Sequence, residues 1–400
     1  MHMRMMACLA TIGLLPSCGS GGNDASSVAP LVPLTGWAAI RAAAAPQVAL
    51  PTEFAAPAPQ QVANDAWEDG IFISRDGLHL FAVYAPADLL SFVLAGADQA
   101  HSGDYLRGPT LGMDLTTIPA GLPNPQPTTW IHANIVHATR TSVTAPFSAW
   151  HLVPMSRAVW SEGAPVAQGP AAGTWDLFVY TSNEHAPDYK AHIALIHGAA
   201  TDPAALGSLL PAPVTTNTSE DNPHLERLSA TSLVLFFDSD DRPGATGQHD
   251  LWYTTSIDNG AAWTTPLPVT ALNTAGEEEQ PHLYRDASNS WWLYFTATNP
   301  ADGKLGIYRT KQVTADDWNS WGAKELVLGA GNTEGVGEPT LTSNGDLSFV
   351  VVTKDPSGPA TNRFDADPWF MAKKSTVTGA MPQVPGRASL ALAMYSPGRP

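Results

Sequence analysis

The sequence predicts an all-β protein that folds as a β-propeller of six four-stranded blades, with five or seven blades as open alternatives. The main observation is an internal repeat: four prolines follow one another at intervals of 58 residues, at Pro165, Pro223, Pro281 and Pro339. The second observation is that the chain is rich in turn residues, with 33 Gly and 35 Pro, and shows no sustained helical periodicity.

Each repeat is expected to contain four strands joined by turns. Twelve residues after the first three prolines, a leucine begins an aromatic strand, at Leu177, Leu235 and Leu293. In the repeat that starts at Pro223, the expected strands cover residues 223–227, 232–237, 249–255 and 267–271. Sheets arranged radially leave only short, protected edges, which favours a propeller over a solenoid.

The repeat starts are expected near residues 70, 109, 165, 223, 281 and 339, within one propeller domain at 61–400. The start at 109 is degenerate, because a proline-rich insertion at 119–127 precedes its expected strands at 130–138 and 147–153. The blade count therefore depends on this segment.

The N-terminus resembles a bacterial lipoprotein signal over residues 1–18. An apolar stretch from Ala7 to Leu15 is too short to span a bilayer but suits a signal peptide. It ends in Leu15-Pro16-Ser17-Cys18, which is similar to a lipobox. The resemblance implies export and lipid attachment at Cys18. The protein would then be anchored to a bacterial membrane and would face the periplasm or the cell surface. Plain secretory cleavage is the alternative, and residues 19–60 are expected to form an Ala/Pro/Gly-rich tether.

Composition limits the partners. The chain has 20 Lys+Arg against 37 Asp+Glu, which argues against nucleic acid or anionic lipid as a partner. Only two cysteines are present, so we expect no disulfide. We expect a monomer that contacts the membrane only through its lipid and uses no cofactor and no metal. The acidic segment Asp238-Ser239-Asp240-Asp241 could ligate calcium, but a solvated loop is the expected interpretation.

One segment resembles the Asp-box of sialidase-type propellers, with Ser256, Asp258, Gly260 and Trp263 at the motif positions. Side chains of the Ser and Asp types satisfy backbone amides of a turn, and glycine permits a positive φ. The resemblance implies a folding device away from any active site. A sialidase activity is disfavoured, because the Arg-Ile-Pro motif of that family does not occur in this chain.

The repeat starts also resemble WD40-like repeats of the TolB type. The best instance runs from Ile73 through Asp76 and Gly77 to Phe81, and the resemblance covers about residues 65–375. It implies a six-bladed propeller and no particular activity.

Polar residues recur just before or within the first strand of each repeat, where propeller geometry brings the blades together. We therefore expect a ligand site at the mouth of the central channel, formed by Asp69, Arg107, Asp221, His224, Glu279, His282 and Glu338. The first hypothesis is a non-catalytic envelope protein that binds a glycan or a protein there. The alternative is a carbohydrate-active hydrolase or lyase that uses these carboxylates and histidines, with the catalytic residues themselves unidentified.

Overall fold

The computed structural model describes residues 36–91, 107–113, 133–156, 160–169, 174–184, 190–240, 242–358 and 363–374. The expected signal peptide and its lipid-attachment residue Cys18 lie outside these residues. Strands dominate the described chain, in which the short helix α1 covers Trp37–Ala43.

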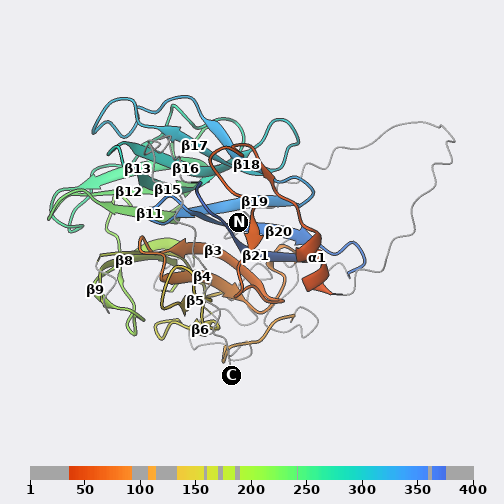
Figure 1. Ribbon diagram of the computed structural model, residues 1–400. Helices are drawn as coiled ribbons and strands as arrows, with labels where there is room; N and C mark the ends of the chain where they lie inside the picture. Colours follow the sequence, from red (N-terminus) through yellow and green to blue (C-terminus); the bar gives the residue numbers. More distant parts are fainter. Residues whose placement is uncertain are drawn as a thin grey trace, which may run out of the picture.

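Five antiparallel sheets form the molecule (Figure 1). Blade 1 consists of β3 (Trp67–Ile73), β4 (His79–Ala85), β5 (Asn134–Thr139) and β6 (His151–Leu152). Blade 2 consists of β7 (Glu162–Gln168), β8 (Thr174–Ser182), β9 (His192–Ala200) and β10 (Ser208–Leu209). Blade 3 consists of β11 (Asp221–Arg227), β12 (Leu233–Ser239), β13 (Asp250–Ser256) and β14 (Leu267–Pro268).

Blades 4 and 5 each include a strand from the N-terminal segment. Blade 4 consists of β15 (Glu278–Arg285), β16 (Trp291–Thr298), β17 (Leu305–Lys311) and β18 (Glu325–Gly329), and β1 (Gln47–Val48) pairs with β18. Blade 5 consists of β19 (Gly335–Leu341), β20 (Leu347–Lys354) and β21 (Phe364–Met371), completed by β2 (Ala58–Pro59). Residues 36–60, which the sequence assigned to a tether, thus pack onto the propeller.

The first strands of the five blades surround the axis of the molecule. β3 contacts β7, and the contacts continue through β11, β15 and β19 back to β3, which closes the ring. Apolar clusters fill the spaces between neighbouring sheets: one lies between blades 5 and 1, and another spans blades 1 to 3. Two further clusters join blades 3 and 4 and blades 4 and 5. Burial between twisted sheets is the main source of stability for this architecture.

The propeller prediction is confirmed, but the prediction of six blades is wrong. The segment near residue 109 does not begin a blade, because Tyr84 at the end of β4 pairs directly with Asn134 at the start of β5. The strands expected in that blade instead correspond to β5 and β6, the third and fourth strands of blade 1. The resemblance to TolB-type repeats also implied six blades, and the structure has five.

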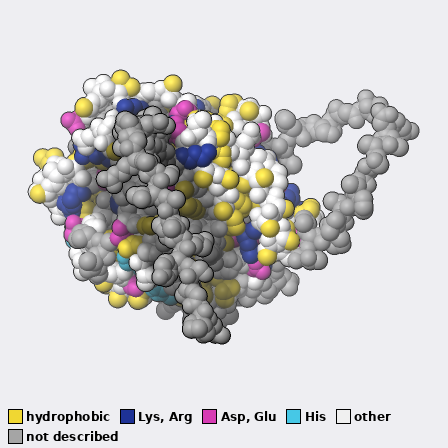
Figure 2. Space-filling view, viewed as in Figure 1, with side chains coloured by type: hydrophobic (Ala, Val, Ile, Leu, Met, Phe, Trp, Pro, Cys, Tyr) yellow, Lys and Arg dark blue, Asp and Glu magenta, His cyan; other side chains and the backbone are white. Residues whose placement is uncertain are grey.

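None of the described helices is long and apolar enough to cross a membrane. On the face drawn in Figure 2, acidic and basic side chains are scattered among uncharged ones and do not gather by sign.

Candidate functional site

The same backbone irregularity occurs in all five inner strands. In each one, the register shifts beside a residue with positive φ, which is the geometry of a β-bulge. The positive-φ residues are Gly70, Ala164, Asn222, Gln280 and Glu338. The residues that precede them are Asp69, Gly163, Asp221, Glu279 and Gly337. Three acids therefore occupy equivalent positions in blades 1, 3 and 4, and a fourth acid takes the next position in blade 5.

Hydrogen bonds between blades hold these bulges. Asp238 Oδ2 accepts hydrogen bonds from Asn222 Nδ2 at 2.9 Å and from the backbone N–H of Gln280 at 2.8 Å. Gln280 Oε1 in turn accepts from the backbone N–H of Glu338 at 2.9 Å. Asp238, considered above as a calcium ligand, is thus a buried acceptor that links blades 3 and 4. Such bonds offset the conformational cost of positive φ at residues other than glycine.

The acids gather at one level of the channel. Asp69, Asp221 and Glu338 line a single small cavity. Glu279 is fully buried, and it lies close enough to Glu338 for its negative charge to raise the pKa of Glu338. The structure therefore brings together the four carboxylates that the sequence selected. Gly70 is needed beside them, because a Cβ there would lie 2.4 Å from the Val83 side chain.

Burial makes these carboxyl groups unusually basic. The pKa of Asp69 rises from 3.8 to about 7 because the group is buried, although the Trp67 Nε1–H donates to Asp69 Oδ2 at 2.5 Å. Among the described residues, Asp69 Oδ1 has no hydrogen-bond partner. The pKa of Asp221 also rises to about 7, through burial and the neighbouring Asp238 carboxylate. Protonated and ionised carboxyl groups can therefore coexist here near neutral pH.

Glu338 is likewise shifted toward its protonated form. Its pKa is raised well above the usual range by burial, and further by the negative charges of Asp69, Glu279, Asp238 and Asp221. His249 shows the opposite balance. Burial disfavours its charged form, but the hydrogen bond to Asp238 and that carboxylate's charge raise its pKa to about 10.

The two predicted histidines form the next level of the channel. His224 and His282 each follow a positive-φ residue by two positions, and their ring centroids lie 4.2 Å apart. They line a second small cavity together with Phe72 and Glu338. Burial lowers the pKa of both rings, and that of His282 falls well below its usual value. Neutral imidazoles therefore lie next to the acids.

Beyond the histidines, an ion pair that the sequence analysis missed spans the channel. Arg75, just after β3, pairs with Glu226 of blade 3. Its Nη2 also donates to the backbone oxygen of Leu283 at 2.7 Å. The repeat contained the signal, because Arg75 follows Ile71 by four positions, as Arg227 follows Pro223. Only Arg75 turns inward, since Arg227 Nη1 donates to the nearby backbone oxygen of Ala230.

Arg107 does not join the channel residues. Its Nη2 donates to Asp365 Oδ1 of β21 at 2.8 Å, and its guanidinium lies over the Trp37 ring of α1 at 4.4 Å. It therefore packs between the N-terminal helix and blade 5. The physical reason also explains the missing sixth blade: none of the five inner strands that the structure describes begins near residue 109, so none carries Arg107 toward the channel.

The segment that resembles an Asp-box forms the turn between β13 and β14. Ser256 Oγ donates to Asp258 Oδ1 at 2.8 Å and accepts from the backbone N–H of Gly260 at 2.9 Å. Gly260 has φ +88, and Trp263 packs in the apolar cluster that spans blades 1 to 3. The segment lies outside the two channel cavities and contributes to folding.

No protein-family model matches the chain, and no curated protein matches it. The chain is similar in structure to the catalytic domain of a GH62 α-L-arabinofuranosidase from Coprinopsis cinerea, at 14% identity and a TM-score of 0.46, over 78% of this chain and 91% of that one. It is also similar to an endo-arabinase from Bacteroides thetaiotaomicron, at 10% identity and a TM-score of 0.44, over 80% and 96%. A further similar structure is the NanB sialidase from Streptococcus pneumoniae, at 12% identity and a TM-score of 0.37, over 60% and 36%. At such identities and TM-scores, the likeness carries no argument about activity.

Proposed function

We propose that the protein is a carbohydrate-active hydrolase whose active site is the acidic level of the channel. One observation carries this proposal: carboxyl groups from blades 1, 3 and 5 line one buried cavity, and burial moves the pKa of Asp69 and Asp221 to about 7. Buried carboxyl groups without a compensating cation are costly for the fold. Groups tuned to titrate near neutral pH are characteristic of general acid and base catalysis.

The charge of the site selects a neutral, hydroxyl-rich substrate. Among the described residues, no lysine or arginine forms an ion pair with Asp69, Asp221 or Glu338. An anionic substrate would be repelled, whereas sugar hydroxyl groups can donate hydrogen bonds to ionised carboxylates.

The proposed reaction needs one carboxylate and one carboxylic acid. Asp69 acts as the base: it takes a proton from a water molecule, whose oxygen then attacks the anomeric carbon. A carboxylic acid on the opposite side donates its proton to the departing glycosidic oxygen, so the products are two free hydroxyl compounds. The donor is either Glu279 or Glu338, and the variants described below separate these two roles.

The test is hydrolysis of a panel of aryl glycosides and polysaccharides, followed by release of the aryl group or of reducing ends. Asp69→Asn is expected to lower kcat by about 10²–10⁴-fold with little change in KM. The same loss in either Glu279→Gln or Glu338→Gln identifies the proton donor. An aryl glycoside with a good leaving group should restore the rate of the donor variant, because its departure needs little protonation.

Asp176→Asn is the matched control, because Asp176 is an exposed residue of β8 outside both channel cavities. Its rates should equal those of the wild-type protein. If a glycan binds but the wild-type protein hydrolyses nothing faster than Asp69→Asn does, the site is a non-catalytic binding site and the proposal is wrong.

A further inference from the structure

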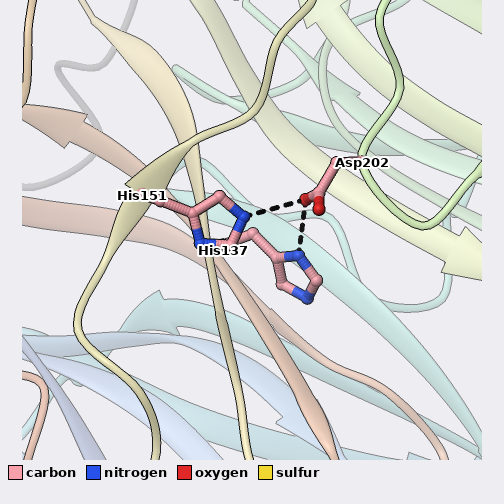
Figure 3. A group of neighbouring side chains, drawn as sticks. All are labelled: His137, His151 and Asp202. Carbon is pink, nitrogen blue, oxygen red and sulfur yellow. Dashed lines mark hydrogen bonds and ion pairs between the residues drawn. The ribbon is translucent and has the colours of Figure 1, made fainter.

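A second group of ligand-type side chains lies away from the channel, where blades 1 and 2 meet. His137 belongs to β5, His151 belongs to β6, and Asp202 follows β9. His137 Nδ1 lies 2.7 Å from Asp202 Oδ1, and His151 Nε2 lies 3.1 Å from the same oxygen (Figure 3). Three segments thus direct one donor atom each toward a common point, and these atoms all lie within 4.8 Å of one another.

We propose that His137, His151 and Asp202 bind a divalent transition-metal ion of the zinc type. Two imidazole nitrogens and one carboxylate oxygen form a ligand set that suits Zn²⁺, with a fourth position left for water. Ligand atoms around such an ion lie somewhat over 3 Å apart, given metal–ligand bonds of about 2.0–2.2 Å. The observed separations of 2.7 and 3.1 Å need only a small expansion.

The surroundings of His137 support metal binding through Nδ1. Its other nitrogen, Nε2, lies 3.1 Å from His79 Nδ1. With Nδ1 on the metal, Nε2 carries the proton and His79 accepts it, which is the outer-shell hydrogen bond usual for metal-binding histidines. The His137 ring also stacks on Phe81 with centroids 4.0 Å apart, so its orientation is set by packing.

Blades 1 and 2 both contribute residues to the proposed metal site, and solvent can reach it. The His137 side chain is fully buried, whereas those of Asp202 and His151 are 35% and 48% exposed. The backbone N–H of Met155 donates to the oxygen of Pro203 at 2.8 Å, which ties the segment after His151 to the segment of Asp202. A bound ion would therefore link blade 1 to blade 2 and stabilise the fold through binding.

The test uses the full chain without a histidine tag, freed of metal with a chelator and titrated with Zn²⁺ by calorimetry. We expect one Zn²⁺ ion per chain and a rise in the thermal midpoint. His151→Ala and Asp202→Asn should each weaken Zn²⁺ binding at least tenfold, and both residues are exposed enough for the variants to fold. His197→Ala is the matched control, because His197 is an exposed histidine of β9 outside the cluster; its affinity should equal that of the wild type.

Two further measurements separate ligation from a hydrogen-bonded cluster. Co²⁺ in place of Zn²⁺ should give the visible absorption of a four- or five-coordinate ion, and this absorption should change in His151→Ala. His79→Phe, which keeps a ring but loses the acceptor, should weaken Zn²⁺ binding by about 10–100-fold. Unchanged Zn²⁺ affinity in both His151→Ala and Asp202→Asn, or absence of binding to the wild type, would overturn the proposal.

Discussion

Arg75 of blade 1 and Glu226 of blade 3 form an ion pair across the channel, below the two neutral histidines. The acidic level of the channel begins six residues earlier in the chain, at Asp69 of β3. The channel thus contains a compensated charge pair at one level and an excess of negative charge at another. The contribution of the ion pair to stability should therefore increase with pH, whereas the contribution of the acidic level should decrease with pH.

Glu226→Gln should lower the free energy of unfolding by about 1–3 kcal/mol at pH 7. Burial opposes ionisation of Glu226, but Arg75 and His224 lower its pKa below the usual range. A carboxyl group with a lowered folded-state pKa stabilises the fold above its unfolded-state pKa, and this contribution disappears as pH falls through the folded-state value. The difference between variant and wild type should therefore shrink below about pH 4. Urea unfolding at several pH values measures it.

Glu325→Gln is the control for this comparison. Glu325 also pairs with an arginine, Arg309, at 2.9 Å, but its side chain is 48% exposed. The loss there should stay below about 1 kcal/mol. Equal losses in the two variants would contradict a special contribution from the pair in the channel.

Asp69→Asn should stabilise the protein, by roughly 2–4 kcal/mol at pH 8. Burial raises the folded-state pKa of Asp69 from 3.8 to about 7, so the folded protein binds the proton more tightly than the unfolded chain. Wild-type stability therefore falls as pH rises from about 4 to 7, and the asparagine variant avoids this loss. The gap between the two proteins should be small at pH 4 and full above pH 7.

Chemical unfolding at both pH values checks this prediction, with the exposed Asp302→Asn as a variant that should show no such gap. A constant difference between Asp69→Asn and wild type across the range would mean that Asp69 does not titrate as proposed. A more stable and inactive Asp69→Asn protein would fit an active site that is maintained at the expense of stability.

Gly260→Ala should lower the thermal midpoint more than Gly303→Ala does. Both glycines have positive φ, at +88 and +72, so both variants bear the backbone strain. Only at Gly260 would the new Cβ meet a neighbour, the Leu195 side chain at 3.1 Å, whereas Gly303 has open space. Equal midpoints would show that the contact with blade 2 does not constrain the turn between β13 and β14.

The sequence alone determined the propeller class and four of the acids. Pro165, Pro223, Pro281 and Pro339 mark first strands in the structure, because each follows the positive-φ residue of a bulge. This local geometry repeats with the sequence and could be read from it. Asp69, Asp221 and Glu279 could be selected for the same reason, since equivalent positions of a radial repeat meet at the axis. Glu338 lies one position later in blade 5.

Only the tertiary structure decided the blade count, the place of Arg107 and the metal-ligand cluster. Tyr84 pairs with Asn134 across a long insertion, and no local pattern shows which distant strand completes a sheet. His137, His151 and Asp202 come from different strands and loops of two blades, so their spacing in the chain carries no signature. Repeated local geometry is encoded in nearby residues, whereas strand pairing and contacts between blades depend on how the whole chain buries its apolar faces.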